Sequence, residues 1–174
     1  MKKVIKLDIG SGNYNSVLKE LEIYRNHLME KVNTFVDALI QEGMQVAKAR
    51  IASTKGDSTD VAADAVYISS TGEVTKAIIY MTGTDVLFVE FGAGIAYNTG
   101  EQHPLASEFG YGPGTYPSEH PPNRGINPGR WVYGHDDNGK PLESIGTEAT
   151  MPMFRAAEHI RNIIVQKANE VFRS

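Results

Sequence analysis

The chain has 174 residues, a formal net charge of -4 and no cysteine; 41% of its residues are hydrophobic and 22% are charged. This length predicts one domain, 1–174, with its own core, and the lack of cysteine excludes disulfides, thiolate metal sites and cysteine nucleophiles. The weakly acidic charge argues against gripping nucleic acid phosphates over a broad basic face, and no apolar run approaches the roughly 18 residues of a membrane span.

The N-terminal part of the chain changes its periodicity once. Residues 5–9 alternate between apolar and polar, which predicts a half-buried strand. From about Ser16 the apolar residues recur at threes, fours and sevens, which predicts a helix of some 35 residues capped by Asn15 or Ser16. A helix this long exceeds the diameter of a small domain, so part of its apolar stripe is expected to meet another subunit. Gly43 indicates a close approach or a bend inside it.

Three further elements follow. Residues 65–70 and 74–82 are rich in Val, Ile and Tyr around a short turn, which predicts a β-hairpin. The run 86–91 fits a strand or a helical turn that ends at Gly92. Pro152 opens an amphipathic helix that continues to the C-terminus.

The segment 92–150 differs in composition from the rest. All eight prolines lie from Pro104 to Pro152, so we expect a long irregular loop at 92–150 that can become ordered on assembly. The fold class is therefore α+β: a long N-terminal helix and a C-terminal helix packed on a small, mostly antiparallel sheet, with a long Gly/Pro-rich loop.

Two motifs in this loop could bind a nucleotide or nucleic acid, but each has a simpler structural interpretation. Residues 134–140 match the first seven places of a phosphate-binding P-loop, but Pro141 replaces the magnesium-binding Ser or Thr, and Asn138-Gly139 predicts a polar turn or hairpin tip. Trp131 and Tyr133 could stack on single-stranded nucleic acid, although a packed or subunit-burying aromatic pair is favoured because few cations accompany them.

Histidines near carboxylates raise the alternative of a metal-dependent hydrolase that uses a His/Asp/Glu-rich loop. They are His103, His120, His135 and His159. Because no close His/carboxylate pairing lies on a regular element, loop histidines that only hydrogen-bond are favoured. We predict no catalytic, cofactor-binding or metal-binding residue.

Glu90 stands out because a carboxylate between Val89 and Phe91 is costly to bury without a partner. We expect it to face a subunit boundary or to cap a nearby backbone turn. A solvated surface carboxylate is the plain alternative. In either role, we expect Glu90→Gln to change ring formation more than monomer stability.

Five short motifs follow one another in a fixed order. They are Val46-Ala47-Lys48-Ala49-Arg50-Ile51, Val89-Glu90-Phe91-Gly92, His103-Pro104-Leu105, Trp131-Val132-Tyr133-Gly134 and Pro152-Met153-Phe154. In this order and spacing the chain resembles the head–tail joining family of long-tailed double-stranded DNA bacteriophages, described as neck, minor tail or tail-completion proteins. Ala93 stands where the family usually has Thr, and Met153 where an aromatic usually follows the helix proline.

The resemblance implies a small α+β virion protein, assembled in the host cytoplasm, that forms a ring between the capsid connector and the tail tube. The ring is typically sixfold, and DNA passes through it without specific binding. Its partners are other copies of the chain, head connector or stopper proteins and tail-tube proteins, with no membrane involved. The expected assembly interface comprises Glu90, Phe91, Trp131, Tyr133, Met153 and Phe154.

Overall fold

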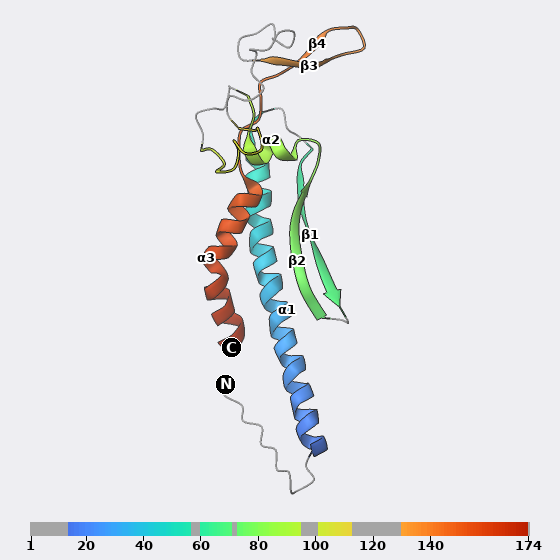
Figure 1. The fold of residues 1–174 in the computed structure, drawn as a ribbon, viewed down its shortest axis with the longest axis vertical. Coiled ribbons are helices and arrows are strands. Elements are labelled where there is room, and N and C mark those ends of the chain that lie inside the picture. The colour runs from blue at the N-terminus through green and yellow to red at the C-terminus, as the bar shows by residue number, and fades with distance from the viewer. Residues whose placement is uncertain (1–13, 57–59, 71–72, 95–100, 113–129, 174) are drawn as a thin grey trace.

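The structure is a computed structural model that describes residues 14–56, 60–70, 73–94, 101–112 and 130–173. Three helices and two hairpins are formed there, which confirms the α+β class (Figure 1). In chain order they are α1 (Tyr14–Ala52), β1 (Ala62–Ser70), β2 (Glu73–Thr82), α2 (Val86–Phe91), β3 (Trp131–His135), β4 (Pro141–Ser144) and α3 (Pro152–Arg173). No helix of this described part is long and apolar enough to cross a membrane.

The long N-terminal helix is confirmed, with 39 residues. It begins at Tyr14, ahead of both predicted caps, and the predicted strand at residues 5–9 lies outside the described residues. In Figure 1 the C-terminal half of α1 is flanked by α3 on one side and by the β1–β2 hairpin on the other, while its N-terminal end extends past both. Among the described residues, α1 contributes to the core through its C-terminal half.

The core forms where α1, the hairpin and α3 meet. Its buried side chains are those of Ile40, Met44, Ala47, Ala63 and Ala156. Gly43 lies at the same level, and a Cβ built there would be 2.6 Å from Ile79 Cδ1 and 2.7 Å from Ile160 Cδ1. The predicted close approach at Gly43 is confirmed, because only a glycine lets both isoleucines come so near to the helix backbone.

The β1–β2 hairpin is also confirmed, and both strands begin slightly earlier than predicted. The strands pair antiparallel, with Ala65 opposite Ile79 and Val66 opposite Ile78, and the register shifts between Ile68 and Ser69. Ala65, Ala77, Ile79 and Met81 pack towards the core. Because neighbouring residues of a strand point to opposite faces, the hairpin covers α1 with one face only.

Residues 86–91 form a helix, α2, and not a strand. Gly92 ends it with φ 79°, and the Gly92 N–H donates to the Phe88 carbonyl over 2.7 Å. A left-handed conformation suits glycine, and the chain turns there towards Ala149, whose Cβ would lie 2.9 Å from any Cβ at position 92.

Regular structure interrupts the irregular loop expected over 92–150, so that expectation is wrong at residues 131–144. Strands β3 and β4 form a second antiparallel hairpin inside it. Its tip follows the predicted Asn138-Gly139 turn, where Asp136 Oδ1 accepts hydrogen bonds from the Asn138 and Lys140 N–H groups, each at 2.9 Å. The glycine- and proline-rich stretch 113–129 lies outside the described residues, so its ordering on assembly stays a prediction.

Candidate functional site

Segments that are far apart in sequence join between the end of α1 and the start of α3. Thr147 forms antiparallel bridges with both Gly56 and Ala93, and the Ala93 and Thr147 N–H groups each donate to the other's carbonyl at 3.0 Å. The Glu148 N–H donates to the Lys55 carbonyl at 2.9 Å. The strand-like stretch before α3 is thus held between the ends of α1 and α2, and it delivers the first turn of α3 next to α2.

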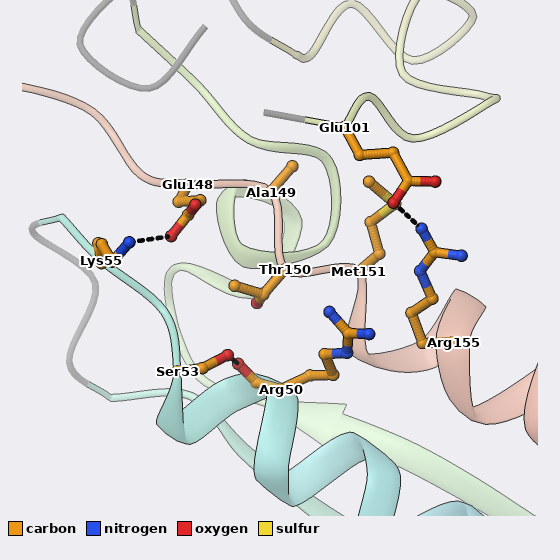
Figure 2. Close-up of a pocket in the computed structure, with 9 residues that line it drawn as sticks. All are labelled: Arg50, Ser53, Lys55, Glu101, Glu148, Ala149, Thr150, Met151 and Arg155. Atoms are coloured by element: carbon orange, nitrogen blue, oxygen red, sulfur yellow. Dashed lines mark hydrogen bonds and ion pairs between the residues drawn. The ribbon is translucent and has the colours of Figure 1, made fainter. Parts of the chain in front are cut away.

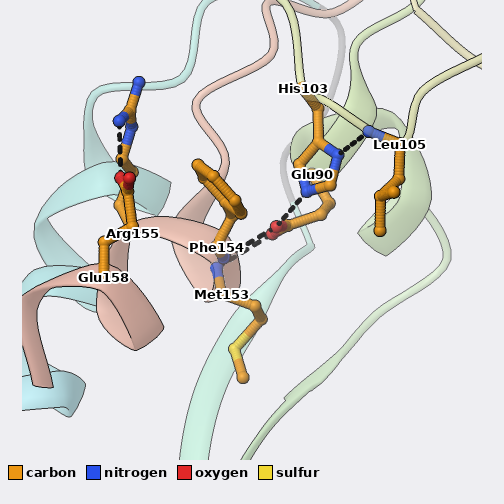
Figure 3. Close-up of polar contacts among 7 residues, drawn as sticks. All are labelled: Glu90, His103, Leu105, Met153, Phe154, Arg155 and Glu158. Carbon is orange, nitrogen blue, oxygen red and sulfur yellow. Dashed lines mark hydrogen bonds and ion pairs between the residues drawn. The ribbon is translucent and has the colours of Figure 1, made fainter. Parts of the chain in front are cut away.

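Glu90 of α2 caps that first turn. Its Oε2 accepts the Met153 N–H and its Oε1 accepts the Phe154 N–H, both at 2.9 Å (Figure 3). These N–H groups have no partner inside a helix, and Pro152, at the preceding position, has no N–H to satisfy. The carboxylate also lies at the positive end of the helix dipole.

His103 closes the site from the loop side. Its Nε2 lies 3.4 Å from Glu90 Oε1, and its Nδ1 accepts the Leu105 N–H at 3.0 Å. This geometry puts the ring proton on Nε2, where it faces the carboxylate. The side chains of His103 and Glu90 are 5% and 9% exposed, so the contact is shielded from water. We call the set Glu90, His103, Met153 and Phe154 the Glu90 junction.

Aromatic rings pack around the Glu90 junction. The Phe91 ring stacks on Phe109 and Tyr111, with centroids 5.2 and 5.9 Å away, and meets the His103 ring edge-on at 4.5 Å. His103 in turn contacts the Phe154 ring at 5.0 Å. The loop residues 103–111 therefore contact α2 and α3 through His103, Phe109 and Tyr111, and removing them would expose Phe91 and take the His103 contact from Glu90.

A pocket of about 320 Å³ lies beside the junction (Figure 2). Charged side chains from α1, α3 and the connecting segments line it, and several pair with one another. Lys55 Nζ is 3.8 Å from Glu148 Oε2, while Arg155 pairs with Glu101 and also reaches Glu158 at 2.6 Å. The hydrogen bond that Arg155 donates to Glu101, followed by the one it donates to Glu158, raises the pKa of the Arg155 guanidinium. The Arg155–Glu101 ion pair links residue 101 to α3.

Met151 lines the same pocket in an unusual backbone conformation. It is the one described non-glycine residue with a positive φ, 53°, and it is only 2% exposed. The Thr150 and Met151 N–H groups both approach the Val89 carbonyl, at 3.1 and 3.4 Å. Strain of this kind persists where the surrounding contacts fix it, and here it sets the direction in which α3 leaves the junction.

The structure brings together four of the six residues expected at the assembly interface. Glu90, Phe91, Met153 and Phe154 meet within the protomer, and Phe91 is only 8% exposed. Glu90 caps a backbone turn, which was one of its two predicted roles, and the solvated alternative is wrong. Trp131 and Tyr133 lie in β3, at its start and at the register shift, and their side chains lie outside the description.

The histidines considered for the alternative hydrolase do not gather into a site where the structure describes them. His103 binds Glu90, His159 Nε2 lies 3.3 Å from Glu42 Oε2, and His135 is exposed in β3. Among the described residues no three His, Asp or Glu side chains are placed to hold a metal ion. His120 lies outside the described residues.

Sequence reasoning missed three contributors: Phe109, Tyr111 and Arg155. The aromatic content of residues 103–111 was a usable signal for packing, but nothing in the sequence indicated that Arg155 pairs with Glu101.

No protein-family model matches this chain, and neither does any curated protein or solved structure.

Proposed function

We propose that this chain is a structural virion protein of a tailed phage or prophage, and that it forms a ring at the head–tail interface as a neck or tail-completion component. DNA passes through the ring without being bound specifically. The proposal starts from the five ordered motifs and the family that they resemble.

One observation of the fold supports the proposal. Three of the five motifs, 89–92, 103–105 and 152–154, meet in the Glu90 junction, so they act as one structural unit. Glu90 accepts two backbone N–H groups and faces His103, which leaves the carboxylate holding three chain segments together. An arrangement in which the polar groups satisfy one another suits a rigid scaffold that presents surfaces to neighbouring subunits.

Electron microscopy of the purified full-length chain tests the proposal. We expect annular particles with a central opening, typically of six subunits, whose fraction rises with protein concentration. The genes beside the one for this chain provide a second test, because portal, capsid, connector and tail-tube genes are expected there. A strictly monomeric protein whose gene lies in a metabolic operon would contradict the proposal.

The alternative, a metal-dependent hydrolase, makes a different prediction for the purified protein. We expect metal analysis to find no zinc or manganese in a fixed ratio to the chain. A tightly held ion that is lost on His120→Ala or His135→Ala, with His27→Ala as the control on α1, would instead support the hydrolase.

A further inference from the structure

The N-terminal part of α1 carries an apolar stripe that no described element covers. Its members recur at helical spacing and are 41–61% exposed: Tyr14, Leu18, Leu21, Tyr24 and Leu28. The aromatic contact between Phe35 and Phe172, with centroids 5.7 Å apart, lies near the last residues of α3. Figure 1 shows α1 continuing beyond that point and beyond the tip of the β1–β2 hairpin. The stripe is about 22 Å long at 1.5 Å per residue.

The β1–β2 hairpin also has an apolar face on which none of the described elements packs. Opposite the face that packs on α1, it presents four large side chains in adjoining cross-strand positions: Val66, Ile68, Ile78 and Tyr80. Three of them, Val66, Ile68 and Tyr80, are 38–44% exposed. A strand with one solvated face alternates apolar and polar residues, whereas residues 77–81 are apolar without interruption, as in strands buried on both faces. The sequence of β2 is therefore typical of a strand that is buried on both faces.

We propose that the exposed stripe of α1 in one copy of this chain packs on the outer face of the β1–β2 hairpin in the next copy. The inference rests on the proposed ring function and names the two surfaces that would join its subunits. Each hairpin would then lie between two helices, its own α1 on the inner face and a neighbour's α1 on the outer face. Each subunit would contact one neighbour through its α1 stripe and the other neighbour through its hairpin face. A contact between two different surfaces is heterologous, and such contacts can close into a ring.

Pairing of the stripe with the same stripe of another copy fits less well. About six parallel helices spaced by roughly 10 Å around an axis would leave a channel only about 10 Å across. That is narrower than the roughly 12 Å major groove of duplex DNA alone. A contact between α1 and a hairpin separates neighbouring helices by the thickness of a sheet and so allows a wider opening.

The two faces share an apolar character. On α1 and on the hairpin the large side chains are 38–61% exposed: Tyr14, Leu18, Leu21, Tyr24, Leu28, Val66, Ile68 and Tyr80. Asp64 and Lys76, opposite Tyr80 and Ile68 in the hairpin register, add a charged border of both signs. An apolar centre with a polar rim is the usual anatomy of a subunit interface.

The test removes one surface at a time in the full-length protein. Leu21→Glu places a charge in the α1 stripe and Ile68→Glu places one in the hairpin face, and sedimentation velocity measures assembly. We expect each variant alone to associate at least 10-fold more weakly than the wild type. Two matched controls, Ile23→Glu on the other side of α1 and Val165→Glu on α3, are 56% and 69% exposed before substitution and should assemble normally.

Mixing the variants decides whether the contact is heterologous. Leu21→Glu keeps its hairpin face and Ile68→Glu keeps its stripe, so an equal mixture should recover pairs but no rings. Pairs formed by Ile68→Glu alone, or no recovery in the mixture, would overturn the inference. Rings that survive both substitutions would overturn it and leave the proposed function standing. A wild-type chain that never associates would also overturn it, and the gene neighbourhood would then decide the proposed function separately.

Discussion

At the scale of single residues, Glu90 matters most, because its carboxylate caps the first turn of α3. Thr150 is two positions before Pro152, and Met151, directly before it, has no side-chain oxygen, so α3 lacks the usual capping residue. The cap comes instead from a carboxylate 63 positions earlier in the chain. A buried carboxylate is tolerated only when its oxygens find donors, and here they find two backbone N–H groups and an imidazole.

Glu90→Gln should therefore destabilise the monomer, in contrast to the expectation that it would mainly affect assembly. The amide keeps one acceptor, but its NH₂ group faces an N–H donor of α3, and the charge at the helix N-terminus is lost. We expect the free energy of unfolding to fall by about 1–3 kcal/mol. Thermal melting measures this, with the exposed Glu108→Gln as the control. Equal melting temperatures for wild type and Glu90→Gln would contradict the capping role.

At the scale of elements, the body depends on the crossing of α1 with α3 and the β1–β2 hairpin. Gly43 is the point at which both neighbours come closest to the α1 backbone. Further along the same helix pair, Glu42 accepts hydrogen bonds from Lys167 at 2.9 Å and from His159 at 3.3 Å. Close packing at Gly43 and the ionic contacts of Glu42 therefore hold two neighbouring residues of α1 against other elements.

Gly43→Leu should lower the melting temperature by overpacking this crossing. Adding methylenes to a packed interior costs about 1–3 kcal/mol or more, which exceeds the about 1 kcal/mol gained by replacing glycine in a helix. The control is Ala49→Leu at an exposed position of α1. If Gly43→Leu melts at or above the wild-type temperature, α1 does not approach its neighbours as closely as described.

The ionic cluster predicts a pH dependence of stability. The hydrogen bond from Lys167, and then that from His159, lowers the pKa of Glu42 below its ordinary value of 4.5. A carboxyl whose pKa is lowered on folding stabilises the fold above its unfolded pKa, and this contribution is lost as the pH falls through the folded pKa. Between about pH 5 and pH 3, Glu42→Gln should therefore lose less stability than the wild type. Melting curves across this range check it, with Glu30→Gln expected to follow the wild type.

At the scale of the whole molecule, the surfaces that the described residues leave exposed are as informative as the core. The α1 stripe and the outer face of the β1–β2 hairpin leave large apolar side chains in water, while the Glu90 junction satisfies its polar groups internally. Contiguous apolar patches of this kind mark interaction sites. They favour contact with another protein surface over recognition of a small polar ligand.

Binding to DNA should accordingly be weak. The chain has 17 Lys and Arg residues against 21 Asp and Glu residues, so few counterions are available for release. We expect fluorescence anisotropy with short single- and double-stranded oligonucleotides to detect little binding at low salt and none at about 150 mM. Nanomolar binding that resists salt would contradict a ring through which DNA passes without being held, and would turn attention to Trp131 and Tyr133.

The sequence by itself determined the elements whose causes are local. Periodicity predicted α1, the β1–β2 hairpin and α3, because side chains three, four or two positions apart share a face whatever the rest of the chain does. Asn138-Gly139 predicted the tip of the β3–β4 hairpin because Gly139 can adopt a positive φ, and Gly43 predicted a close approach because glycine has no Cβ. Composition misled at residues 131–144, where Gly134, Gly139 and Pro141 belong to a hairpin.

Only the tertiary structure decided how the Glu90 junction is made. That Glu90 caps α3, that His103 lies beside it and that Arg155 pairs with Glu101 all depend on chain segments that meet after folding. The same holds for residues 86–91, where a run of Val, Leu and Phe suits either a helix or a strand and the packed surroundings select the helix. Contacts of this kind arise from long-range packing, which leaves no periodic signal in the sequence.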